Sequence, residues 1–66
     1  MSEIYRTPVL SEKQDYFLSF LRNLGITEDE WSLTDTSKDY CFYEINLSNK
    51  DTIILSELNN HQVDFL

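Results

Sequence analysis

Hydrophobic and polar residues follow a helical period most clearly over residues 11–24. Five large apolar residues recur there at the spacing that gathers them on one face of a helix: Tyr16, Phe17, Phe20, Leu21 and Leu24. Ser11 and Gln14 have the spacing of a capping box, and Gly25 suits the left-handed residue that ends a helix in a Schellman motif. The pattern therefore predicts a helix over 11–24. Leu18 falls on its opposite side, among polar residues, and we interpret it as singly exposed.

A period of two takes over after residue 30. Thr27 and Glu30 repeat the capping-box pattern and predict a single helical turn, after which residues 31–34 alternate between apolar and polar. The polar run 35–39 indicates a hairpin loop. Residues 40–47 form the clearest strand pattern, and four of them share one face: Cys41, Tyr43, Ile45 and Leu47. In this hairpin we expect Leu33 beside Cys41 and Trp31 beside Tyr43.

Residues 52–58 fit both periods, and the two interpretations lead to different folds. As a strand, the segment pairs with 40–47 across the polar turn 48–51. As a helix capped by Asp51, it turns three residues to one side: Ile54, Leu55 and Leu58. We favour the strand, because the apolar residues of all three predicted strands then share one face of the sheet.

Together these elements predict an α+β fold in a single domain, with one amphipathic helix packed on a three-stranded antiparallel β-meander. Its parts are an extended arm at 1–10 that is either an edge strand or a loop, the helix at 11–24, the meander at 31–58 and, after a turn at Asn59 and Asn60, a short extended tail within 59–66. The expected core is Phe17, Phe20, Leu21, Leu24, Trp31, Leu33, Tyr43, Ile45 and Ile54.

Charge narrows the range of partners. The 66 residues include twelve Asp and Glu against five Lys and Arg, a net charge of −7. We therefore expect no direct binding to nucleic acid or to a membrane surface, since both are anionic. No apolar run approaches the roughly 18 residues of a membrane span, and the single cysteine fits a reducing compartment, so we expect a soluble cytoplasmic protein.

Candidate chemistry is sparse. The only cysteine, Cys41, lies in mid-strand on the expected core face, which argues against a catalytic dyad with the only histidine, His61. Five carboxylates crowd into residues 28–39, but they lack the alternating ligands and sharp glycine turn of a calcium loop. We therefore expect no enzyme activity, no cofactor and no metal.

The same carboxylates predict a protein-binding surface. Six acids fall between residues 28 and 44 against Lys38 alone, and aromatic residues border them. Acids steer and orient a basic partner, whereas aromatic anchors supply affinity. The predicted partner-binding residues are Glu28, Asp29, Glu30, Trp31, Asp35, Asp39, Tyr40, Phe42 and Glu44. They indicate a small non-catalytic module, similar in general type to inhibitors and antitoxins, that covers a basic surface of another protein, such as a nucleic-acid-binding surface.

A second interpretation rests on the other face of the predicted sheet. The apolar residues that point away from the helix are Tyr40, Phe42, Ile53 and Leu55. Either the arm and the tail cover them or another chain does, because large apolar patches are seldom left in water. The alternative function is therefore a small accessory subunit or a homo-oligomer, such as a homodimer, that assembles through this face.

Overall fold

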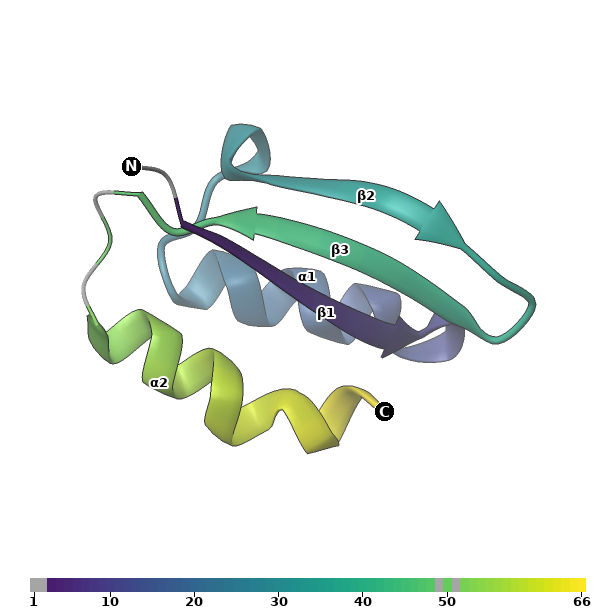
Figure 1. Cartoon of the computed structure of the whole chain (residues 1–66). Coiled ribbons are helices and arrows are strands. Elements are labelled where there is room, and N and C mark those ends of the chain that lie inside the picture. The colour runs from purple at the N-terminus through teal and green to yellow at the C-terminus, as the bar shows by residue number, and fades with distance from the viewer. Residues whose placement is uncertain (1–2, 49, 51) are drawn as a thin grey trace.

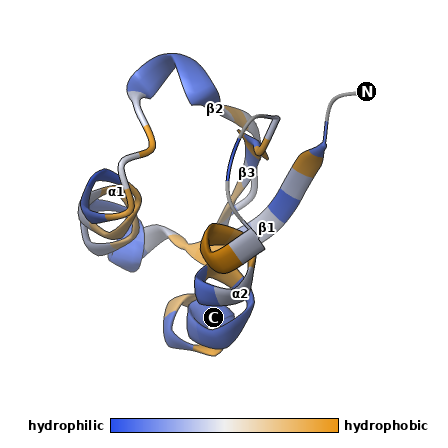
Figure 2. Cartoon of the chain, turned by 90° about the vertical axis from the view of Figure 1, so that its left-hand side faces the viewer, coloured by the Kyte–Doolittle hydropathy of each residue, from blue (hydrophilic) through white to orange (hydrophobic). Residues whose placement is uncertain are grey.

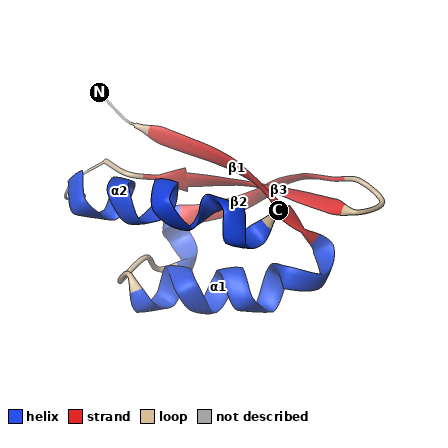
Figure 3. Ribbon diagram, turned by 90° about the horizontal axis from the view of Figure 1, so that it is seen from below, coloured by secondary structure: helices blue, strands red, loops and turns tan. Residues whose placement is uncertain are grey.

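The computed structural model describes residues 3–48, 50 and 52–66, and its α+β architecture has two layers (Figure 1). The described strands form one antiparallel sheet in the order β1-β3-β2, with β1 at Ile4–Leu10, β2 at Trp31–Thr36 and β3 at Tyr40–Asn46. Helices α1 (Gln14–Asn23) and α2 (Thr52–His61) lie on the same side of that sheet (Figure 3). Short 3₁₀ turns lie before α1 at η1 (Ser11–Lys13), before β2 at η2 (Glu28–Glu30) and after α2 at η3 (Gln62–Phe65). The predicted fold class is confirmed.

Helix α1 carries the predicted apolar stripe and has the predicted ending. Phe17 and Leu21 are fully buried, and Phe20 and Leu24 pack half-buried against the same core. Gly25 has a φ of +82°, and its amide donates to the Arg22 carbonyl at 3.0 Å. The following amide, of Ile26, donates to the Leu21 carbonyl at 3.0 Å. These two bonds are those of a Schellman motif, so the helix ends as the sequence predicts.

The predicted capping box at the start of this helix does not form. The chain first makes the 3₁₀ turn η1, and neither the side chain of Leu10 before η1 nor that of Lys13 before α1 makes a capping hydrogen bond. Ser11 Oγ lies 3.7 Å from Cys41 Sγ, and Gln14 Nε2 donates to the Tyr43 hydroxyl at 2.9 Å. Both polar side chains therefore attach the helix to β3, and tertiary contacts outweigh the local cap.

The predicted third strand of the meander is wrong, because residues 52–58 belong to α2. The place beside β3 is taken by β1, which pairs with it from Ile4 opposite Asn46 to Leu10 opposite Tyr40. Once the arm completes the sheet, the C-terminal segment is left to cover the core, and a helix with Leu58 buried does so. The expected cap, Asp51, lies outside the described residues.

The extended tail is also wrong, since α2 continues through both asparagines to His61 and η3 follows it. The reason is Phe65, which is buried against the aromatic residues of α1. Its ring centroid lies 4.9 Å from that of Phe17, 5.2 Å from that of Tyr16 and 5.3 Å from that of Phe20. A helical turn brings Phe65 to this aromatic cluster.

The hairpin of β2 and β3 is confirmed, but its register differs from the prediction by two residues. Trp31 faces Ile45 and Leu33 faces Tyr43. The loop is shorter than expected, because β2 continues to Thr36, and the register shifts once more after Leu33. The shift of two keeps Trp31 and Leu33 on their predicted face, whereas the second shift turns Asp35 to the opposite face, beside Phe42.

The core lies between the sheet and the two helices. Its buried apolar residues are Val9, Phe17, Leu21, Ile26, Cys41, Tyr43, Ile45, Leu47, Leu58 and Phe65. The predicted core face of β3 is therefore confirmed. Leu33 is the exception among the predicted core residues, because its side chain is 46% exposed. Figure 2 shows why: α2 lies nearest β1, whereas β2 stands at the far edge of the sheet.

Candidate protein-binding surface

The predicted binding residues all lie on the β2–β3 hairpin or beside it, but they divide into three groups. Glu28, Asp29 and Glu30 form η2 immediately before β2, Asp35 and Asp39 lie near the hairpin loop, and Tyr40, Phe42 and Glu44 belong to β3. Strand β2 runs from Trp31 to Thr36, and Asp35 lies near its end, so most of the strand separates the first two groups. Five extended residues span about 17 Å, well beyond the Debye length of about 8 Å at physiological salt. The acids therefore make two separate negative spots.

The first spot lies at η2, where the predicted capping box is present. The Thr27 amide donates to Glu30 Oε1 at 2.9 Å, and Lys50 Nζ lies 2.8 Å from Glu30 Oε2. The Lys50 ammonium and the Thr27 amide lower the pKa of Glu30 to about 2. Glu30 is thus occupied in holding the turn to the chain after β3, whereas Glu28 and Asp29 are exposed to solvent.

The second spot lies near the hairpin loop, where Asp35 and Asp39 are exposed. Asp35 Oδ1 accepts a hydrogen bond from the Thr36 amide at 2.8 Å, and the Asp39 carbonyl accepts one from the Ser11 amide. These bonds fix the backbone. Neither carboxylate makes an ion pair within the described residues, and the same holds for Glu28 and Asp29, so their charges face water.

The third group lies on the face of the sheet that carries no helix. Glu44 is paired with Arg6 of β1 at 2.6 Å, so its charge is largely offset. Phe42 is 37% exposed and lies opposite Pro8, and the two line a shallow hollow of about 290 Å³ together with Asp35. Phe42 and Asp35 are therefore brought together on this face.

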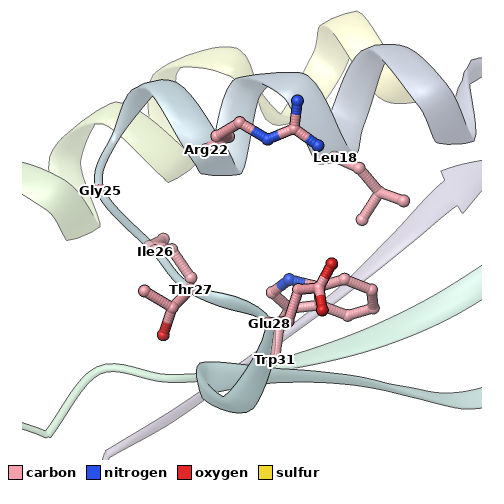
Figure 4. Close-up of a pocket in the computed structure, with 7 residues that line it drawn as sticks. All are labelled: Leu18, Arg22, Gly25, Ile26, Thr27, Glu28 and Trp31. Atoms are coloured by element: carbon pink, nitrogen blue, oxygen red, sulfur yellow. The ribbon is translucent and has the colours of Figure 1, made fainter.

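A groove between α1 and β2 is the feature that sequence reasoning missed. It has a volume of about 240 Å³ and is lined by Leu18, Arg22, Gly25, Ile26, Thr27, Glu28 and Trp31. In Figure 4, Leu18 and Arg22 project from α1 across an open space from Glu28 and Trp31. Leu18 is half-buried and packs against the edge of the core. Its apolar side chain on the polar side of a helix was the available signal.

Strand β2 borders this groove and forms one edge of the sheet. Among the described strands its only neighbour is β3, and residues 32–36 are all exposed. The Trp31 ring packs on Tyr43 with centroids 5.6 Å apart, which anchors the start of the strand to the core. Leu33, one pleat further along, points to the same face and remains half in water.

The described contacts do not assemble a catalytic group. Cys41 is buried beside Ser11, whereas His61 lies 3.0 Å from Asp64 and 3.4 Å from Glu57 and packs on the Phe20 ring. Within residues 3–48, 50 and 52–66, no group of three or more His, Cys, Asp or Glu side chains is placed to hold a metal ion. In the same part of the chain, no helix has the length and apolarity needed to cross a membrane.

No protein-family model matches the sequence, and neither the characterised proteins nor the solved structures compared with it gave a match.

Proposed function

We propose that the protein is a small non-catalytic protein-binding module, inhibitor- or antitoxin-like in its mode of action, that covers a basic surface of a partner protein. The observation that supports this proposal is the exposed β2 edge with unpaired acids at both ends. Glu28 and Asp29 precede the strand, and Asp35 and Asp39 lie near its end. Two of the acids nearby are neutralised within the chain, so these four are the ones available to a partner.

The charge indicates the class of partner. Carboxylates in water attract Lys and Arg side chains and raise the rate of association with a basic surface. Basic surfaces on intracellular proteins commonly bind nucleic acid. We therefore propose a nuclease, a polymerase or a DNA-binding regulator as the target, and the cytoplasm, where the single cysteine stays reduced, as the site of action.

Affinity purification from the native host tests the proposal. Wild-type protein should retain a partner with a basic surface, and the retained amount should fall as salt rises from about 0.1 M to 1 M, where the Debye length drops from about 10 Å to about 3 Å. The quadruple variant Glu28→Gln, Asp29→Asn, Asp35→Asn and Asp39→Asn should lose that partner while keeping its circular dichroism spectrum and melting temperature.

A control variant removes three other charges: Asp15→Asn, Glu57→Gln and Asp64→Asn. These residues lie in α1, α2 and η3, away from β2, so this variant should retain the partner. Equal losses in the two variants would mean that net charge alone matters. An acidic partner, or retention that ignores salt, would contradict the proposal.

A second candidate function is assembly through the outer face of the sheet. Its apolar residues differ from those predicted, because α2 removes Ile53 and Leu55 and β1 contributes its own. The face carries Ile4, Pro8, Leu10, Tyr40 and Phe42. Ile4 is 49% exposed, and no described helix covers this side. Sedimentation at micromolar concentration tests this candidate: a dimer that Phe42→Glu dissociates supports it, and a strict monomer removes the homodimer.

A further inference from the structure

The backbone of β2 has hydrogen-bonding groups that none of the described strands satisfies. An antiparallel strand uses the groups on one of its sides for its partner, and here that side is taken by β3. The N–H and C=O groups on the other side point to solvent, which is the usual template for pairing with a further strand. Figure 1 shows this edge along the top of the sheet, with η2 curling above its start.

The opposite edge of the sheet is less suited to a further strand. Strand β1 contains Pro8 near its middle, and proline has no amide hydrogen to donate to a ladder. In addition, η3 packs against β1 and α2 lies beneath it, as Figures 1 and 2 show together. Of the two described edges, β2 is therefore the one open to a partner.

The groove between α1 and β2 supplies what an edge alone lacks, namely a pocket for side chains. An added strand directs alternate side chains to the face where the groove lies. The lining of the groove is mixed: Leu18, Ile26 and Trp31 are apolar, whereas Arg22, Thr27 and Glu28 are polar. Leu33, on the same face of β2 as Trp31, is half in water. The apolar part of the groove fits a Val, Ile or Leu side chain of the added strand.

We propose that β2 binds an extended segment of the basic partner as an added strand. The proposal rests on the proposed function and names its mode of binding. Residues 31–33 of β2 pair regularly with β3, before the register shift, and the added strand would pair along this regular part of β2. Alternate apolar side chains of the segment enter the groove, and its Lys or Arg residues reach the acids before and after the strand.

Charge selects a different protein over a second copy of this chain. Two β2 strands paired antiparallel would bring Glu28 and Asp29 of one copy towards Asp35 and Asp39 of the other. Parallel pairing would bring each acidic pair against its own counterpart. Both arrangements place like charges together between chains that already carry −7 each, whereas a segment with basic ends meets opposite charge at both positions.

A peptide probe tests the inference on the full chain. The probe alternates Val and Thr and carries a pair of Lys residues at each end. Titration into isotopically labelled protein should shift the NMR signals of Leu18, Ile26 and Trp31, and hydrogen exchange should slow at amides of β2. The signals of Val63, in η3, should not move. A probe with Glu in place of Lys, and one with a central Pro, should each bind at least about tenfold more weakly.

A matched pair of variants locates the contact. Leu33→Lys puts a positive charge on the groove face and should weaken binding of the Lys-flanked probe about tenfold. Val63→Lys makes the same change in charge at a residue that is 72% exposed in η3, and it should bind like the wild type. Both sites are substantially exposed, so both variants should fold.

Absence of binding by the Lys-flanked probe, shifts centred on Phe42, or equal binding by the Glu-flanked probe would each overturn the inference. The proposed function would survive any of these results, because the amide variants and their effect on the basic partner decide it separately. If the amount of retained partner did not depend on salt, that result would contradict both the proposed function and this inference. Chain association through β2, seen as a concentration-dependent dimer that Leu33→Lys dissociates, would replace the partner segment with a second copy.

Discussion

Glu30 shows how one side chain can serve local and long-range structure at once. Its carboxylate closes the capping box with Thr27 and pairs with Lys50, which follows β3. The same residue was predicted to bind a partner, yet its charge is already used inside the molecule. Glu28 and Asp29, its neighbours in η2, keep their charges exposed. Within one turn, the position of each acid decides whether it holds the fold or faces solvent.

The lowered pKa of Glu30 predicts a dependence of stability on pH. Because the pKa falls from 4.5 to about 2 on folding, ionised Glu30 stabilises the folded state above pH 4.5, and this contribution is lost as pH falls towards 2. Glu30→Gln should therefore lower the melting temperature at neutral pH, and its difference from the wild type should vanish near pH 2. Glu28→Gln is the control, since it removes a charge from the same turn without touching Thr27 or Lys50. A difference for Glu30→Gln that stays constant from pH 7 to pH 2 would contradict the assignment.

At the scale of elements, the end of α1 depends on one backbone conformation. Gly25 adopts a positive φ, and a Cβ placed there would meet no atom within 4 Å, so the cost of a side chain comes from the backbone alone. Gly25→Ala should reduce the free energy of unfolding by about 1–2 kcal/mol. Gly25→Asn should lose less, because asparagine tolerates the left-handed region better. Urea denaturation of both variants provides the measurement, and equal losses would point to a contact rather than to the backbone.

Elements with a clear local pattern were predictable from the sequence, whereas the element whose state depends on which segment pairs with β3 was not. Helix α1 and the β2–β3 hairpin have a marked end or a polar loop that fixes them locally. Residues 52–58 carry apolar side chains that suit either period, and their state depends on whether β1 or this segment pairs with β3. Which segment pairs with β3 depends on contacts throughout the chain, not on the residues of the segment alone. The groove was unpredictable for the same reason, since it exists only because α2 lies towards β1 and leaves β2 uncovered.

At the scale of the whole molecule, the small size of the chain makes each core residue decisive. A 66-residue domain buries only about 60% of the surface that its unfolded chain exposes, and typical stabilities at this length are about 3–10 kcal/mol. The core has a single layer of side chains between the sheet and the helices. Phe17 lies at its centre, with Tyr43 on the sheet side and Phe65 on the η3 side.

Truncating this central ring should remove most of the stability. Phe17 is 1% exposed, and Phe17→Ala should cost about 3–5 kcal/mol through lost burial and the cavity that remains. Tyr16→Ala is the neighbouring control, because Tyr16 is 60% exposed and should cost much less. Thermal and urea unfolding of the two variants give the comparison. A loss below about 1 kcal/mol for Phe17→Ala would mean that the core is arranged differently.

Because β1 pairs with β3, the sheet cannot form during synthesis until most of the chain has been made. Strand β1 is synthesised first, and Ile4 pairs with Asn46, the last residue of β3. This pair can form only after the ribosome has added the residues between them. At about 5–20 residues per second, this delay is about 2–8 s. An unpaired nascent strand is exposed during that time to strands of other nascent chains. Pro8 interrupts its ladder of donors, so the residue that closes this edge in the finished fold also protects the unfinished one.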